Sequence, residues 1–191
     1  NEGDGTFLEV TKDAGFEIQN YCKNTGATWF DFNNDGFLDI YVSDWGNCDS
    51  NSLYKNNGDG TFENVTNVIG LSQEGKTESF ISLPFDFNED GWMDLYVTND
   101  LDKPNYMYIN DKGNFFIEKA EEYGLDSKEN DMGLTVGDFN KDGFFDIFIT
   151  AINENILYSN NGNNKFVNVA ENYNVDSTDW AWGTRFSDFD L

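Results

Sequence analysis

Apolar residues in this chain occur in short alternating runs, which is the pattern of β-strands rather than of helices. In the clearest run Leu38, Ile40 and Val42 fall on one face of a strand, and Tyr41 and Ser43 fall on the other. β-branched and aromatic residues dominate these runs, and helical periodicity is absent. The pattern therefore predicts an all-β fold.

The runs group into sets of four. The first set predicts strands over 27–32 and 37–43, a third strand at Leu53 and Tyr54, and a fourth carrying Phe62 and Val65. Asn-Gly and Asp-Gly pairs between the last two strands indicate a hairpin turn. Four antiparallel strands in every repeat of about 50–55 residues are typical of a β-propeller blade. A β-sandwich would also be all-β, but it gives no reason for repetition in phase.

Two motifs repeat along the chain. The first, Asp-Phe-Asn-x-Asp-Gly-x-x-Asp, occupies 31–39, 86–94 and 138–146, and a fourth copy begins at Asp188 and Asp190. The second occupies 53–66, 107–120 and 157–170, and residues 3–11 match its end. We therefore predict blades at 27–66, 80–120 and 134–170, the end of a preceding blade at 1–15, and the start of a following blade at 182–191.

This division predicts an incomplete propeller fragment. We expect the remaining blades to come from a longer chain or from another chain. Because open blade edges are sticky, we expect the isolated segment to be oligomeric or poorly soluble.

The charge of the chain restricts its partners. It has 36 acidic and 11 basic residues, with a formal net charge of −25. Nucleic acids and anionic membranes require a basic surface, so neither is expected as a partner. Many of the acids lie in the repeated loops, which suggests that bound cations neutralise them.

The repeated loops present oxygen ligands at the spacing that calcium requires. Positions 1, 3, 5 and 9 offer carboxylate or amide oxygens, position 7 offers its backbone carbonyl, and glycine at position 6 allows the turn. The predicted ligands are Asp31, Asn33, Asp35, Phe37 and Asp39; Asp86, Asn88, Asp90, Trp92 and Asp94; and Asp138, Asn140, Asp142, Phe144 and Asp146, with Asp188 and Asp190 in the fourth, truncated copy.

Other metal sites fit the loops less well. An EF-hand needs glutamate at position 12, where this chain has Val42, Val97 and Ile149. The loops contain no sulfur or imidazole, which disfavours soft metals, and magnesium prefers fewer protein ligands. The chain contains no histidine at all, so it can form neither a His-ligated zinc site nor a Ser-His-Asp triad.

These motifs resemble FG-GAP/VCBS-type repeats, which are related to integrin α-subunit propellers. The run Asn-Asn-Gly-Asp-Gly-Thr-Phe-x-x-Val-Thr is especially similar to bacterial proteins that carry an ASPIC/UnbV domain. The resemblance implies an extracellular or cell-surface propeller of about seven blades, often without catalytic activity. The literal Phe-Gly and Gly-Ala-Pro signatures are missing, which weakens an integrin-like function.

Two functions remain open. The first is a non-catalytic scaffold for protein or glycan binding or adhesion, and the second is an accessory or catalytic propeller of a secreted carbohydrate-active enzyme. In a meander blade the calcium loops share one face, so a partner is expected on the opposite face. That face carries residues 44–47, 99–103, Trp180 and Trp182.

Cys22 and Cys48 are predicted to reach the same face, opposite the calcium loops. Because the chain has two cysteines, a disulfide between them has a single possible connectivity. Such a bond would stabilise the fold by roughly 3 kcal/mol in the chain-entropy model. Two unrelated free thiols are the alternative.

Overall fold

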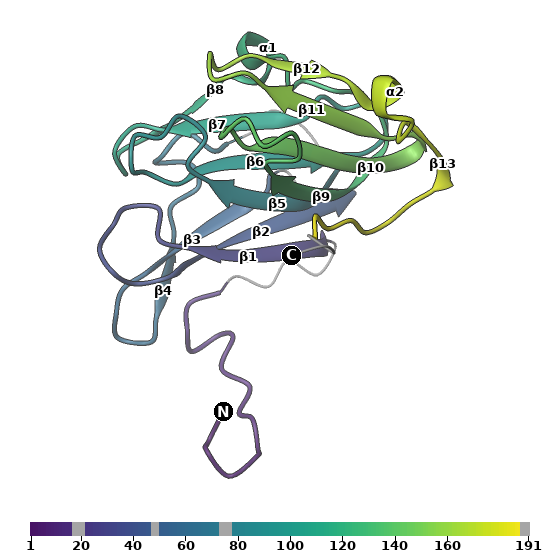
Figure 1. Cartoon of the computed structure of the whole chain (residues 1–191). Coiled ribbons are helices and arrows are strands. Elements are labelled where there is room, and N and C mark those ends of the chain that lie inside the picture. Colours follow the sequence, from purple (N-terminus) through teal and green to yellow (C-terminus); the bar gives the residue numbers. More distant parts are fainter. Residues whose placement is uncertain (17–21, 47–49, 73–77, 188–191) are drawn as a thin grey trace.

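The computed structural model describes residues 1–16, 22–46, 50–72 and 78–187. Their architecture is all-β, with three antiparallel sheets that pack face to face (Figure 1). The first four strands of each sheet form a meander in which strands adjacent in sequence are hydrogen-bonded neighbours. This confirms the predicted fragment of a β-propeller.

Each blade has four strands in chain order. The first contains β1 (Cys22–Phe30), β2 (Asp39–Gly46), β3 (Ser52–Asn56) and β4 (Phe62–Asn64). The second contains β5 (Ser79–Phe85), β6 (Asp94–Asn99), β7 (Tyr106–Asn110) and β8 (Phe116–Glu118). The third contains β9 (Asp131–Gly137), β10 (Asp146–Glu154), β11 (Ile156–Asn160) and β12 (Phe166–Asn168), and β13 (Ser177–Trp180) pairs with the far end of β10.

Two short helical turns were not expected from the sequence. α1 (Ala120–Tyr123) and α2 (Ala170–Tyr173) follow the fourth strands of the second and third blades. Each ends at a residue in the left-handed conformation, Gly124 or Asn174. A four-residue helix is too short to show a 3.6-residue period, so the hydrophobic pattern gave no signal for it.

The core lies between the sheets and uses both faces of the middle blade. Leu95 and Val97 in β6 pack toward the first blade, and Tyr96 between them packs toward the third. All six residues of β6 are buried. Ile40 and Tyr41 lie on opposite sides of β2 and are both buried, and Tyr41 belongs to the core between the first two blades.

The segment after each fourth strand connects one blade to the next. The carbonyl of Ile69 accepts a hydrogen bond of 2.7 Å from the backbone N–H of Phe116, which begins β8. The carbonyl of Ala14 accepts an equivalent bond of 2.8 Å from Phe62, which begins β4. Residues 1–16 therefore meet the first blade as the first blade meets the second, although the assignment of 1–15 to a preceding blade stays a prediction.

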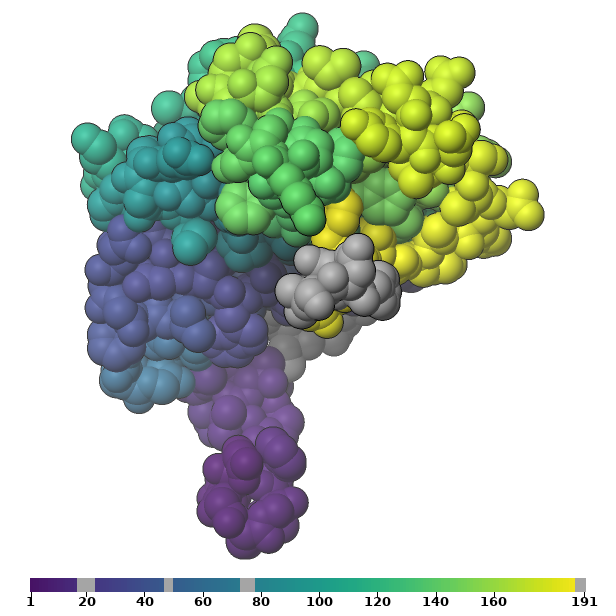
Figure 2. Space-filling view, in the orientation of Figure 1, coloured from purple at the N-terminus to yellow at the C-terminus, as the bar shows by residue number. Residues whose placement is uncertain are grey.

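The two ends of the chain lie differently on the molecule. The N-terminal residues project from its body, and Phe7 is 80% exposed (Figure 2). The C-terminal segment returns to the third blade, where the backbone N–H of Phe186 contacts the Thr135 hydroxyl at 3.4 Å. Within the described ranges, no helix is long and apolar enough to cross a membrane.

Candidate metal loops

The three Asp-rich loops join the first and second strands of the three blades. β1 pairs with β2 up to Phe30 and Asp39, and the other two loops begin after equivalent pairs. The loops therefore leave their blades at the same end, as the meander predicted.

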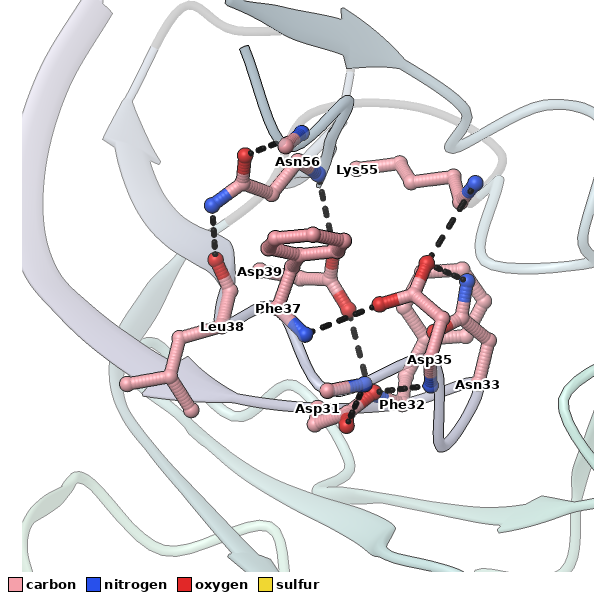
Figure 3. A network of polar contacts seen from close by, with 11 residues as sticks. Asp31, Phe32, Asn33, Asp35, Phe37, Leu38, Asp39, Lys55 and Asn56 are labelled. Atoms are coloured by element: carbon pink, nitrogen blue, oxygen red, sulfur yellow. Dashed lines mark hydrogen bonds and ion pairs between the residues drawn. The ribbon is translucent and has the colours of Figure 1, made fainter. Parts of the chain in front are cut away.

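Backbone N–H groups fold each loop around its carboxylates, as Figure 3 shows for the first loop. In the first loop, Asp31 accepts hydrogen bonds from the N–H of Asp35 at 3.1 Å and of Gly36 at 2.8 Å. The Asn33 side-chain oxygen accepts from Asp35 N–H at 3.2 Å, and the Asp35 carboxylate accepts from Phe37 N–H at 3.0 Å. Positions 1, 3 and 5 thus present their side-chain oxygens to one small turn.

The other two loops repeat this network. Gly91 N–H donates to Asp86 at 2.8 Å, and Gly143 N–H donates to Asp138 at 2.9 Å. The remaining bonds of Asn88, Asp90, Asn140 and Asp142 follow the same pattern. The repeated sequence therefore specifies a repeated geometry.

Two positions in each loop adopt the left-handed backbone conformation. The glycine at position 6 does so with φ of 87°, 88° and 93° in the three loops, as its predicted role requires. Position 4 also does so, with φ of 55° at Asn34, 58° at Glu89 and 61° at Lys141. Glutamate and lysine rarely adopt this conformation, so residue type did not predict it at position 4.

The aspartate at position 9 is a buried link between three strands. Asp39 is fully buried, and its carboxylate accepts hydrogen bonds from Phe32 N–H at 3.1 Å and Asn56 N–H at 2.8 Å. Asp94 and Asp146 accept equivalent bonds from the residue at position 2 of their loop and from the asparagine at the end of the third strand. Sequence reasoning assigned Asp39 to metal binding but missed Asn56, although an asparagine follows Tyr-x in each copy of the second motif.

The buried aspartates lie close to other negative charges. Burial raises the pKa of Asp39 to about 6 and that of Asp94 to about 7, and it also raises the pKa of Asp146. Neighbouring carboxylates add to these shifts, with Asp35 and Asp31 acting on the pKa of Asp39. Each loop therefore concentrates three carboxylates in a partly desolvated space.

The donor set suits a hard cation. Carboxylate, amide and carbonyl oxygens are the ligands that calcium prefers, and a divalent charge would offset the repulsion between the three carboxylates. In the structure these carboxylate oxygens accept hydrogen bonds from N–H groups of the loop. In the part of the chain that the structure describes, no three acidic, cysteine or histidine side chains already meet in metal-binding geometry. Calcium ligation therefore stays a prediction.

Some predicted residues lie outside the described part of the chain. Asp188 and Asp190 are among them, so the fourth loop stays a prediction. The same holds for the disulfide, because Cys48 and the side chain of Cys22 are not described.

Two segments predicted on the opposite face lie close together there. The structure describes residues 44–46 and 99–103 of these segments. The indole N–H of Trp45 donates to the Asp100 carboxylate at 3.2 Å. The Lys23 ammonium lies 4.8 Å from the centre of the Trp45 ring. Trp45 is therefore held between blades, whereas Trp180 and Trp182 are more than half exposed.

Comparison with known proteins places the repeats in a family. Residues 31–83 and 86–149, more than half of the chain, match the model of the FG-GAP-like repeat. Comparison with curated proteins gives no match. The finer resemblance to integrins and to ASPIC/UnbV-domain proteins stays a prediction.

One solved structure is similar over most of this chain. It belongs to an Agrocybe aegerita lectin, described for its specific recognition of non-reducing terminal N-acetylglucosamine. The two are 21% identical with a TM-score of 0.48, and the match covers 87% of this chain and 43% of the lectin chain. The chain thus spans less than half of the length of that lectin.

Proposed function

Since the chain belongs to the FG-GAP-like repeat family, we propose that it is part of an extracellular, calcium-stabilised, non-catalytic propeller that binds a protein or glycan. The observation that carries this proposal is the threefold repetition of one loop geometry at one end of the blades. The opposite end, where the connections between blades vary in sequence, is left for a ligand.

The loop residues would hold calcium through their oxygens. Aspartate or asparagine at positions 1, 3, 5 and 9 would supply side-chain ligands, and the residue at position 7 its backbone carbonyl. Bound calcium would supply positive charge at the point where three carboxylates crowd together. Because position 9 already links the first three strands of its blade, occupation of the loop would stiffen the whole blade.

Calcium binding also supports a location outside the cell. Sites of ordinary affinity need the high calcium concentration of the extracellular space. The charge of −25 agrees with this, because several bound divalent ions would relieve the self-repulsion of a compact acidic chain.

Calorimetric titration of the calcium-stripped chain tests the proposal. We expect at least three equivalents of calcium to bind, and Asp35→Ala should remove one of them. Glu63→Gln, an exposed change in β4 outside the loops, should leave the stoichiometry unchanged. No bound calcium, or a stoichiometry that Asp35→Ala does not alter, would overturn the assignment.

A further inference from the structure

A cleft of about 560 Å³ lies where the first strands of the three blades converge. Its lining comes from β1, β5, β9 and the C-terminal segment, and includes Thr25, Thr28, Phe80, Ser82, Met132 and Trp182. Thr25, Phe80 and Met132 lie in the early part of their strands, and the metal loops follow the ends of these strands. The cleft is therefore nearer the face opposite the loops.

The cleft is built by one position of the repeat. Thr25, Phe80, Met132 and Trp182 each lie six residues before the first aspartate of a loop motif. Equivalent positions of successive blades face a common axis in a propeller. The cleft is thus the mouth of that axis, and its chemistry is set by the residue that each repeat places there.

Two aromatic side chains, Phe80 and Trp182, line this mouth, and Trp180 lies beside Trp182. Trp180 and Trp182 are 61% and 58% exposed, and their rings stack with centroids 6.0 Å apart and an interplanar angle of 19°. Phe80 meets Trp182 edge-on at 5.7 Å. Trp180 does not itself line the cleft, but its indole N–H points to the sulfur of Met132, a lining residue, at 3.3 Å, which fixes the ring beside Trp182. Exposed rings held in this way form a pre-arranged apolar platform.

The polar groups of the cleft favour an uncharged ligand. Its lining contains no charged side chain, and the net charge of −25 repels anions. The Ser82 hydroxyl is buried and has no hydrogen-bond partner among the described residues. Thr25 is already engaged, since its hydroxyl lies 2.7 Å from the Ser79 carbonyl and 3.1 Å from the Ser43 carbonyl, and its single proton is donated to one of them.

We propose that this cleft binds a neutral pyranose sugar, with one ring face stacked on Trp182, whose ring is supported by Trp180. A pyranose combines an apolar C–H face with hydroxyl groups at its edge, which matches an aromatic ring in a cleft whose lining includes the half-buried Thr28. A peptide would fit less well, because its backbone N–H and C=O groups would need several polar partners. The inference rests on the proposed binding function and specifies its ligand class.

Tryptophan fluorescence and calorimetry with cellotetraose, a neutral β-linked glucan, test this site in the calcium-loaded chain. We expect saturable binding with a blue shift of the emission, and no binding of a tetragalacturonate of equal length. Trp182→Ala should weaken cellotetraose binding at least tenfold, and Trp180→Ala several-fold. The matched control is Trp29→Ala, because Trp29 is 55% exposed but lies at the loop end of β1.

The outcomes separate this site from the proposed function. If Trp182→Ala keeps the circular dichroism spectrum of the parent chain and binds cellotetraose equally well, the sugar does not stack on Trp182, although the proposed glycan binding stands. If cellotetraose fails to bind at millimolar concentration while calcium binds, the sugar site is overturned and the calcium scaffold stands. A proline-rich peptide that binds in place of the sugar, and is lost in Trp182→Ala, would likewise overturn the sugar assignment.

Discussion

The side-chain amide of Asn110 in β7 donates a hydrogen bond of 2.8 Å to the backbone carbonyl of Phe32, 78 positions earlier. It also donates to the Met93 carbonyl at 3.0 Å, and its oxygen accepts from Gly113 N–H at 2.7 Å. Asn110 is almost fully buried. One side chain therefore connects the metal loops of the first two blades to the β7–β8 turn.

We predict that Asn110→Ala destabilises the chain by about 1–3 kcal/mol, because it leaves the Phe32 and Met93 carbonyls and the Gly113 N–H without this partner. The midpoint of urea unfolding measures this loss. Asn114→Ala is the matched control, since Asn114 is exposed in the same turn and donates only weakly, at 3.3 Å, to local carbonyls. Equal midpoints for the two variants would contradict a role of Asn110 between blades.

Removal of calcium should lower the melting temperature sharply. A site held at 100-fold above its dissociation constant contributes about 2.7 kcal/mol, so three such sites contribute about 8 kcal/mol. That is comparable to the whole stability of a typical domain, about 5–15 kcal/mol. Calorimetric melting with calcium, with a chelator, and with magnesium in place of calcium measures the effect. If the chelated and loaded samples melt together, the loops are turns that need no metal.

Asp131 at the start of β9 predicts a pH dependence of stability away from the metal loops. Its carboxylate is fully buried and accepts a hydrogen bond from the Asn105 amide, while its other oxygen has no partner among the described residues. Burial is the main reason why the pKa of Asp131 rises to about 7, with further contributions from the charges of Glu129 and Asp100.

The sign of this dependence follows from proton linkage. An unfolded aspartate has a pKa of about 3.9, so the folded state binds the proton more tightly. The stabilisation by Asp131 is thus complete below pH of about 4 and is lost as the pH rises to about 7. Asp131→Asn has no carboxyl group to ionise at this position, so it does not lose this stability as the pH rises. We expect its melting temperature, relative to the parent chain, to rise between pH 4 and 7 and to level off above.

Asp102→Asn controls for the change in net charge, because Asp102 is exposed in the loop after β6. Melting of both variants across the pH range separates a buried carboxylate from a general effect of charge. A difference in melting temperature between the parent chain and Asp131→Asn that stays constant with pH would refute the predicted linkage.

The sequence predicted the repeated parts of this molecule better than the parts that depend on packing. In-phase motifs were sufficient to locate the blades, the loops and the shared face, because turn residues and alternating strands are local signals. The burial of Tyr41 and Ile40 on opposite faces was not predicted, since alternation alone suggests one buried face. Tyr41 is buried against residues of the second blade, and such a contact between distant segments is not encoded in a local pattern.

Within the loops, residue type predicted the carboxylates but not their backbone setting. Glu89 and Lys141 adopt left-handed conformations that their side chains do not favour, so the fold of the loop imposes them. Asp39 was predicted as a ligand, but its bonds to Phe32 and Asn56 arise from strand pairing. A local pattern cannot distinguish an aspartate that binds metal from one that also links strands.

The docking of one blade on the next predicts different costs for two glycines with similar backbone angles. Gly70 has φ of +82°, and a Cβ there would lie 2.7 Å from the carbonyl oxygen of Phe116. That oxygen cannot retreat easily, because Phe116 N–H is bonded to Ile69. Gly60 has φ of +90°, but a Cβ there would meet nothing within 4 Å.

We therefore expect Gly60→Ala to cost about 1–2 kcal/mol from the left-handed conformation alone. Gly70→Ala should cost about 1–3 kcal/mol more, because the added methyl group also forces the segment after β4 away from β8. Urea unfolding of the two variants measures the difference, which isolates the contact between blades from the strain that both share. Equal losses of stability in the two variants would show that β8 shifts to accommodate the methyl group at no energetic cost. The segment after β4 would then not hold the second blade against the first.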